Sequence, residues 1–179
     1  MANSHLTITI FAFLLLKLSY FPSTSAYETG SIKPGLNRVD VVVEGKVYCQ
    51  SCDHFGSWSL TKAEPIPSAK ISVICKNYLK QVSFYKAYQT DKNGYFYAQL
   101  DGFKIGSNIL DHPLQSCKVK LVSSSIAHCS LLSNVNYGID GAPLRFESKI
   151  LRRNRYDVAV YAAGPLAFRP ANCPPESHV

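Results

Sequence analysis

The chain has 179 residues, of which 19 are Lys or Arg, 12 are Asp or Glu and six are Cys, and its formal net charge is +7 at pH 7. This length is that of one ordinary domain, which is large enough to bury a hydrophobic core of its own. No internal repeat, low-complexity tract or Pro- or His-rich stalk is present, which excludes repeat and fibrous architectures.

The N-terminus carries an apolar stretch over residues 6–16, LTITIFAFLLL. It is too short to cross a membrane as a helix, which needs about 20 residues, but it has the length of a signal-peptide core. Small residues follow at 23–26, so we predict a signal peptide over residues 1–26 that is cleaved after Ala26. Cleavage removes one Lys and no acid, which leaves 18 basic and 12 acidic residues and a net charge of +6. The alternative interpretation of the stretch is a buried N-terminal strand.

The rest of the chain contains no second apolar stretch of membrane length, and residues 170–179 at the C-terminus are polar. We therefore predict neither a membrane anchor nor a lipid-anchor signal. The expected location is outside the cell, in an oxidising compartment where cysteines form disulfides.

Six segments are predicted to be β-strands, two of them from clear alternation, and Gly, Pro, Asn and Asp separate them. In the second segment, the expected inward face holds Ile71, Val73 and Cys75, and the outward face holds Lys70, Ser72 and Lys76. In the fifth segment, Cys117, Val119 and Leu121 face one way, and Lys118 and Lys120 face the other. The predicted strands cover residues 39–48, 69–76, 81–89, 95–100, 116–122 and 156–163.

Several features interrupt this pattern. We expect a bulge at Gly45, a loop over residues 52–67 and little regular structure over residues 123–148. Gly164 and Pro165 are expected to end the last strand. Residues 90–94, TDKNG, give the clearest hairpin signal, because Asn and Gly tolerate the positive φ angles of a tight turn.

Short strands separated by turns, with no sustained helical period, predict an all-β domain. The expected architecture is an antiparallel sandwich or partly closed barrel of about seven strands, with three disulfides. A lead-in segment over residues 27–38 precedes this domain, which covers residues 39–179.

The six cysteines permit many pairings, and spacing alone selects none of them. The spacing of Cys49 and Cys52 also suits zinc, but no second close pair of ligands exists, and His54, His112 and His128 are scattered among predicted loops. A redox motif with this spacing usually begins a helix, whereas this one follows a strand. We predict structural disulfides and neither a metal nor a cofactor.

The run from Val43 to Cys52, VEGKVYCQSC, resembles the opening signature of the plant pollen Ole e I-like allergen and extensin family. This family includes the cysteine-containing PAC domain of non-classical arabinogalactan proteins. The resemblance extends from Val39 to Cys173 and includes residues 90–96 and the late strand at residues 157–161. It implies a β fold and an extracellular or cell-wall location.

The resemblance also implies a disulfide order, which here joins Cys49 to Cys129, Cys52 to Cys173, and Cys75 to Cys117. The last pair is compatible with the expected inward faces of its two strands. The chain departs from the family where an acidic residue and Thr are common between the first two cysteines, because it has Gln50 and Ser51 there.

The sequence offers no constellation typical of an enzyme, so we predict no catalytic residues. A Gly-x-Ser-x-Gly elbow is absent, and Asp91, Asp101 and Asp111 lie in predicted turns, where Asp is favoured for its hydrogen bond to the backbone. Together with the location that the resemblance implies, this absence leads us to expect a non-enzymatic protein of the extracellular matrix.

Two features indicate binding. A basic cluster concentrates positive charge at the residues Lys149, Arg152, Arg153 and Arg155, which suits a polyanion such as pectin. The alternative interpretation of the cluster is a solvated loop, and nucleic acid is a poor partner for a secreted domain. Trp58, the single Trp, lies in the loop after the first cysteine pair and is the candidate for stacking on sugar rings.

These observations predict a secreted protein of the plant cell wall or apoplast that associates with acidic or galactan-type polysaccharides. The alternative function is a secreted ligand or modulator of a cell-surface receptor in growth or pollen-tube development.

Overall fold

The computed structural model describes residues 38–105, 112–152 and 156–173. All of them belong to a unit that spans residues 37–179, and the chain's other unit, residues 1–36, lies outside the described residues. The predicted signal peptide and all of the lead-in segment except Arg38 therefore stay predictions.

The described residues form nine strands, three 3₁₀ turns and one short helix. In chain order these are β1 (Arg38–Cys49), η1 (Cys52–His54), β2 (Glu64–Pro65), β3 (Lys70–Lys76), β4 (Val82–Gln89), β5 (Tyr95–Gln99), α2 (Pro113–Ser116), β6 (Cys117–Ser123), η3 (Ala127–Cys129), β7 (Leu131–Leu132), η4 (Val135–Tyr137), β8 (Ala142–Arg152) and β9 (Tyr156–Arg169).

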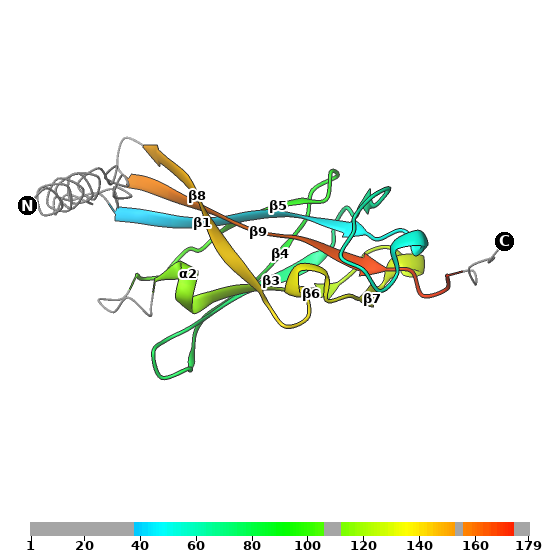
Figure 1. Cartoon of the computed structure of the whole chain (residues 1–179). Coiled ribbons are helices and arrows are strands. Elements are labelled where there is room, and N and C mark those ends of the chain that lie inside the picture. Colours follow the sequence, from blue (N-terminus) through cyan, green and yellow to red (C-terminus); the bar gives the residue numbers. More distant parts are fainter. Residues whose placement is uncertain (1–37, 106–111, 153–155, 174–179) are drawn as a thin grey trace, which may run out of the picture. The chain divides into compact units, whose positions relative to one another are not determined.

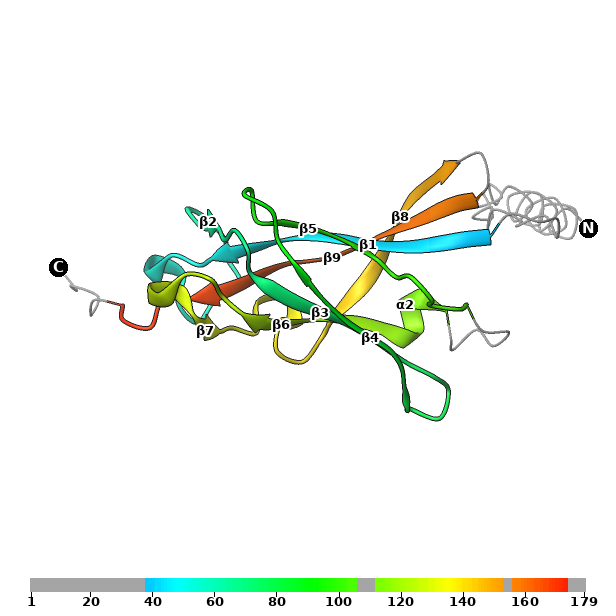
Figure 2. The same cartoon turned by 180° about the vertical axis from the view of Figure 1, so that it is seen from behind.

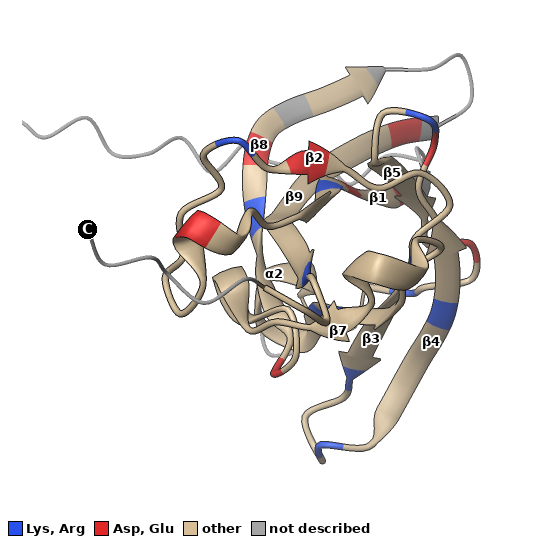
Figure 3. Ribbon diagram, turned by 90° about the vertical axis from the view of Figure 1, so that its right-hand side faces the viewer, with Lys and Arg blue, Asp and Glu red and all other residues tan. Residues whose placement is uncertain are grey.

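The strands form one sheet in the order β2-β1-β9-β8-β6-β3-β4, with β5 paired to β1 and β7 paired to β9. Figures 1 and 2 show β1, β5 and β9 on one side and β3, β4 and β6 on the other, with β8 crossing diagonally between the two sides. The view along the strands in Figure 3 shows the sheet curling around its interior. The expected all-β, partly closed barrel is confirmed, with nine strands in place of about seven. One pair departs from the antiparallel expectation, because β1 and β9 are parallel.

The hydrophobic core lies inside the curled sheet, and it contains the residues that the alternation in β3 and β6 predicts to face inward. In β3, Ile71, Val73 and Cys75 are fully buried, and in β6 Val119 is fully buried. Ser72 is an exception to the predicted burial pattern. It lies in register between Ala87 of β4 and Lys120 of β6, and it is nevertheless 2% exposed.

The structure contains three disulfides, Cys49–Cys129, Cys52–Cys173 and Cys75–Cys117, and these are the pairs that the resemblance implies. Cys75 and Cys117 are directly opposite each other in the β3–β6 ladder. All six cysteines are bonded, so no thiolate remains for the zinc or redox alternatives.

The bulge expected at Gly45 is present, and it coincides with a second irregularity in β9. The β1–β9 register steps from Gly45 opposite Ala163 to Val47 opposite Leu166, so Gly164 and Pro165 of β9 face a single residue of β1. Pro165 cannot donate to a ladder, and the bulge removes the need for a donor there. The strand therefore continues to Arg169, and the expectation that it ends at Gly164 and Pro165 is wrong.

Side chains bind the backbone carbonyls that this irregularity removes from the ladder. The guanidinium of Arg145 donates to the carbonyl of Gly164 at 3.1 Å, and the amide of Asn136 donates to the carbonyl of Pro165 at 2.7 Å. These bonds join β8 and η4 to the bulge.

The hairpin predicted around residues 90–94 is wrong, although the turn itself forms. β4 pairs with β3 and β5 pairs with β1, so the turn connects opposite sides of the barrel. Thr90 fixes this crossing, because its hydroxyl donates to the carbonyl of Ile66 at 2.6 Å and accepts from the amide of Ala69 at 2.9 Å. β4 and β5 contact each other through the hydroxyl of Tyr88, which donates to the carbonyl of Gln99 at 2.6 Å.

The segment over residues 123–148 is more ordered than its sequence predicts. It contains two 3₁₀ turns, the short strand β7 and the first part of β8. The β8–β9 register shifts between Phe146 and Lys149, and Ser148 has a positive φ of 52°. This irregularity breaks the two-residue alternation, which is why the strand is not visible in the sequence.

Candidate functional site

Trp58 lies on the surface in the loop between η1 and β2, as the sequence predicts, and 53% of it is exposed. Its ring packs edge-on against Tyr137 of η4, with the ring centroids 5.0 Å apart and the planes at 80°. Phe55 in the same loop is also exposed, and the guanidinium carbon of Arg169 lies 4.8 Å from the centre of its ring. We call Phe55, Trp58 and Tyr137 the aromatic patch.

The loop that carries Trp58 is held in place by the buried side chain of Gln50. The Nε2 amide of Gln50 donates to three backbone carbonyls of the loop, those of His54 at 3.1 Å, Ser57 at 2.9 Å and Ser59 at 2.9 Å. The backbone amide of Gln50 donates to the carbonyl of Phe168 in β9 at 2.9 Å. Gln50 therefore connects the loop to the barrel.

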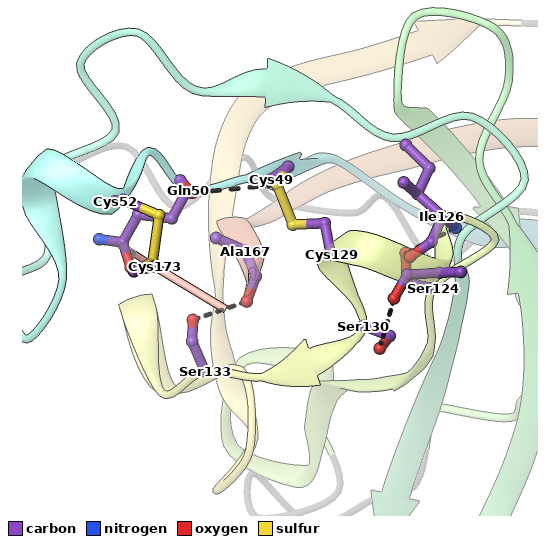
Figure 4. Close-up of a disulfide and its surroundings, with 11 residues drawn as sticks. Cys49, Gln50, Cys52, Ser124, Ile126, Cys129, Ser130, Ser133, Ala167 and Cys173 are labelled. Atoms are coloured by element: carbon purple, nitrogen blue, oxygen red, sulfur yellow. Dashed lines mark hydrogen bonds between the residues drawn. A yellow bond between two sulfur atoms is a disulfide. The ribbon is translucent and has the colours of Figure 1, made fainter. Parts of the chain in front are cut away.

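Two disulfides flank Gln50, as Figure 4 shows. Cys49–Cys129 joins the end of β1 to η3, and Cys52–Cys173 joins η1 to the chain beyond β9. The hydroxyl of Ser133 donates to the carbonyl of Ala167 at 2.6 Å beside them. The aromatic patch is thus mounted on a cross-linked end of the barrel, which limits the conformational entropy that binding would cost.

Replacing Gln50 by Glu should lower the free energy of unfolding by about 2–3 kcal/mol, because a carboxylate cannot donate and would face three carbonyl oxygens. The single Trp makes its fluorescence a reporter of the loop, and we expect the emission of the variant to change at neutral pH. Acidification should restore part of the loss, since a protonated carboxyl donates one hydrogen bond.

Gln50→Met is the matched control, because it removes the donor and adds no charge. It should cost less than Gln50→Glu and should lack the recovery in acid. Chemical denaturation followed by Trp58 fluorescence, at neutral and at acidic pH, measures the free energy of unfolding of both variants. Equal stability of Gln50→Glu and the parent chain would contradict the role assigned to the Gln50 amide.

The predicted basic cluster lies only partly within the described residues. Lys149 and Arg152 are in β8, in register with Val160 and Asp157 of β9. Arg153 and Arg155 lie outside the described residues. A polyanion site at this cluster stays a prediction.

A second basic surface, which the sequence does not reveal as one unit, lies on the outward side of β3 and β6. Lys70 and Lys76 are at the two ends of β3, and Lys118 and Lys120 of β6 lie opposite Ile74 and Ser72. We call Lys70, Lys76, Lys118 and Lys120 the lysine face. The adjacent strands β3, β4 and β6 contain no Asp or Glu, and Figure 3 shows β3 and β4 with basic segments and no acidic ones.

The alternation of β3 and β6 already placed these lysines outward on their separate strands. The sequence does not show that β3 pairs with β6, and this pairing brings the two lysines of β3 and the two lysines of β6 onto one surface. Strand pairing between segments this far apart has no local sequence signal.

Among residues 38–105, 112–152 and 156–173, no group of three His, Cys, Asp or Glu side chains could hold a metal ion. Nor does any helix among the described residues have the length and hydrophobicity needed to cross a membrane.

No protein-family model matches the chain. The non-classical arabinogalactan protein 30 of Arabidopsis thaliana is 33% identical over 144 residues, which are 77% of this chain and 56% of that protein, so the chain spans little more than half the length of this relative. An Olee1-like protein of Betula pendula is 30% identical over 128 residues, which cover 70% of this chain and 68% of the relative.

Structural similarity agrees with these relatives. The crystal structure of the major plantain pollen allergen Pla l 1 matches with a TM-score of 0.52, covering 76% of this chain and 98% of the allergen at 23% sequence identity, which shows a shared fold. The cysteine signature, the curled β fold and the Olee1-like relative together establish that this chain belongs to the plant Ole e I-like family of pollen allergens, which also takes in arabinogalactan-type and extensin-like proteins.

Proposed function

We propose that this protein is secreted into the plant cell wall or apoplast and binds acidic or galactan-type wall polysaccharides without catalysing a reaction. The observation that supports it most is the lysine face, which gathers four cations on one side of the barrel over strands that carry no carboxylate. Relatives named as arabinogalactan and extensin-like proteins support a role in the wall.

The lysine face suits a polymer with regularly spaced carboxylates. Lys118 and Lys120 are two residues apart on one strand, so their side chains leave the same face about 7 Å apart. Lys70 lies on β3, which is paired with β6, and neighbouring strands of a sheet are about 5 Å apart. An extended polyanion can contact several such cations at once, whereas a small anion contacts one.

Binding of this kind must weaken as salt is added. The Debye length falls from about 10 Å at 0.1 M salt to about 3 Å at 1 M, so exposed lysines lose most of their attraction for a polymer. Lysine is a point charge on a flexible stem, and each exposed contact is worth about 0.5 kcal/mol.

The test is retention on immobilised pectin by the mature chain and by Lys118→Gln/Lys120→Gln. Loss of two contacts of about 0.5 kcal/mol should weaken retention about fivefold at 0.1 M salt, and 1 M salt should release both proteins. Retention that is independent of salt, or no retention, would contradict the proposal.

The matched control is Lys92→Gln/Lys104→Gln, which removes the same charge from two exposed lysines outside the lysine face. This control should bind pectin nearly as well as the parent chain. An equal loss in both double variants would assign binding to the net charge and not to the lysine face.

The aromatic patch favours a second candidate function, recognition by a cell-surface receptor. Trp, Tyr and Arg dominate the residues that contribute most to protein interfaces, and Trp58, Tyr137 and Arg169 provide this composition at a rigid end of the barrel. A receptor ectodomain that changes the fluorescence of Trp58, in a protein without polysaccharide affinity, would favour this candidate.

A further inference from the structure

A groove of about 580 Å³ lies over β1, β2 and β5, and its lining shares no residue with the aromatic patch or the lysine face. Its volume is within the range of about 300–1,000 Å³ that is usual for small-ligand sites. The groove is lined by Lys46 and Tyr48 of β1, Pro65 of β2, Asp91 and Asn93 of the turn before β5, and Tyr95 of β5.

Strand pairing brings these residues together. Tyr48 is in register with Pro65, and Lys46 is in register with Tyr95. One side of the groove is therefore a row of apolar and aromatic surfaces from three strands, β2, β1 and β5. The turn over residues 91–94 forms the other side.

The turn is fixed before any ligand arrives. The Oδ1 atom of Asp91 accepts from the backbone amides of Asn93 at 2.8 Å and Tyr95 at 2.9 Å. Gly94 has a φ of 69°, and a Cβ there would lie 2.6 Å from the carbonyl oxygen of Val47 and 2.9 Å from Pro65. This close approach seats the turn on β1 and β2, so Asn93 is held at the edge of the groove.

Tyr95 is also held in place. Its hydroxyl donates to the carboxylate of Glu44 at 2.6 Å. Burial of the hydroxyl, and then this hydrogen bond, raise the pKa of Tyr95 above its ordinary value, so the hydroxyl stays a donor. The ring is thereby tied to β1 beside Lys46.

From this arrangement we infer that the groove is a binding subsite for a neutral pyranose residue of a glycan. Tyr48, Tyr95 and Pro65 offer apolar surface for one face of a sugar ring, and Asp91, Asn93 and Lys46 offer an acceptor, an amide and a donor for its hydroxyl groups. The lining carries one cation and one carboxylate, so its formal charge is zero.

This balance distinguishes the groove from the lysine face. A carboxylated sugar would gain from Lys46 but would be opposed by Asp91, whereas a neutral sugar can bind both groups by hydrogen bonds. Binding in the groove should therefore withstand salt that releases a polyanion from exposed lysines. The inference rests on the galactan part of the proposed function and not on the binding of pectin by the lysine face, so the groove and the lysine face can each fail alone.

The test is a titration of the ¹⁵N-labelled mature chain in 0.5 M NaCl with three tetrasaccharides, a β-1,4-galactan fragment, a cello-oligosaccharide and an oligogalacturonate. At least one of the two neutral probes should shift the amide signals of residues 46, 48, 91, 93 and 95. Asn93→Ala and Tyr48→Ala should each weaken that binding at least tenfold.

Tyr85→Ala is the matched control, since Tyr85 is 61% exposed on β4, outside the groove, and its loss should leave the affinity unchanged. Asn93 is exposed, so its variant keeps the test informative if Tyr48→Ala fails to fold. Three results would overturn the inference: no response to either neutral probe, a response to the oligogalacturonate alone, or shifts centred on another surface such as the Trp58 loop.

Discussion

Replacing Gly45 by Ala is expected to lower the free energy of unfolding by about 3–4 kcal/mol, one of the largest effects that a single methyl group can have in this fold. A Cβ at this position would overlap the backbone carbonyl of Ala163 and would lie 2.7 Å from the ring of Phe96. Neither neighbour can yield easily, because Ala163 is in the ladder of β9 and Phe96 is fully buried.

Gly102→Ala is the appropriate control for this prediction. Gly102 has a positive φ of 83°, and no atom lies within 4 Å of the position that a Cβ would take, so its substitution tests backbone strain without overlap. Its cost should be about 1 kcal/mol. Urea denaturation of both variants measures the difference, and equal losses would show that the contact of β1 with β9 and Phe96 is not what requires glycine at position 45.

The position of Gly45 also shows how far the sequence predicts this fold. The β-branched run of β1 and the alternation in β3 and β6 identify these strands and their inward residues, because each pattern is complete within one segment. The bulge at Gly45 was also predictable from glycine in a strand. What a local pattern cannot contain is that β1 pairs in parallel with β9, more than a hundred residues away.

The two wrong predictions about turns have a common cause. Thr90–Gly94 has the residues of a hairpin turn, and Gly164–Pro165 has those of a strand end, but tertiary contacts determine the outcome at both places. Thr90 bonds to the segment before β3, and Pro165 lies opposite the bulge in β1. Local turn chemistry describes a bend in the chain and does not say which strands the bend connects.

The candidate surfaces also divide into features that one segment of sequence reveals and features that depend on contacts between distant segments. Trp58 could be selected from sequence as an exposed aromatic residue of a loop, and the structure places it on the surface. Its partner Tyr137 and the supporting amide of Gln50 could not be selected, because 79 residues separate Trp58 from Tyr137 and Gln50 acts through backbone carbonyls. The lysine face and the groove likewise depend on pairings between distant strands.

Removing the Cys52–Cys173 disulfide, by substituting Ser for both residues, should lower the free energy of unfolding by about 4 kcal/mol in the chain-entropy model. The two cysteines are 121 residues apart, but Cys49–Cys129 already joins positions near them. With Cys49–Cys129 in place, the shortest path from Cys52 to Cys173 runs over three residues to Cys49, across that disulfide, and over forty-four residues from Cys129. Cys52–Cys173 therefore closes a loop of about 47 residues, and the length of this loop determines the expected cost.

The same substitution should also release the aromatic patch, because this disulfide joins η1, at the start of the Trp58 loop, to the chain beyond β9. Removal of Cys75–Cys117 is the control: it closes 42 residues, so the expected loss of about 4 kcal/mol is similar, but the bond links β3 to β6 and holds no part of the loop. Only the Cys52/Cys173 variant should change the emission of Trp58 in the folded state and speed proteolysis within residues 53–60. If both variants left Trp58 unchanged, the hydrogen bonds of Gln50 alone would hold the loop, and Gln50→Glu would then be expected to release it.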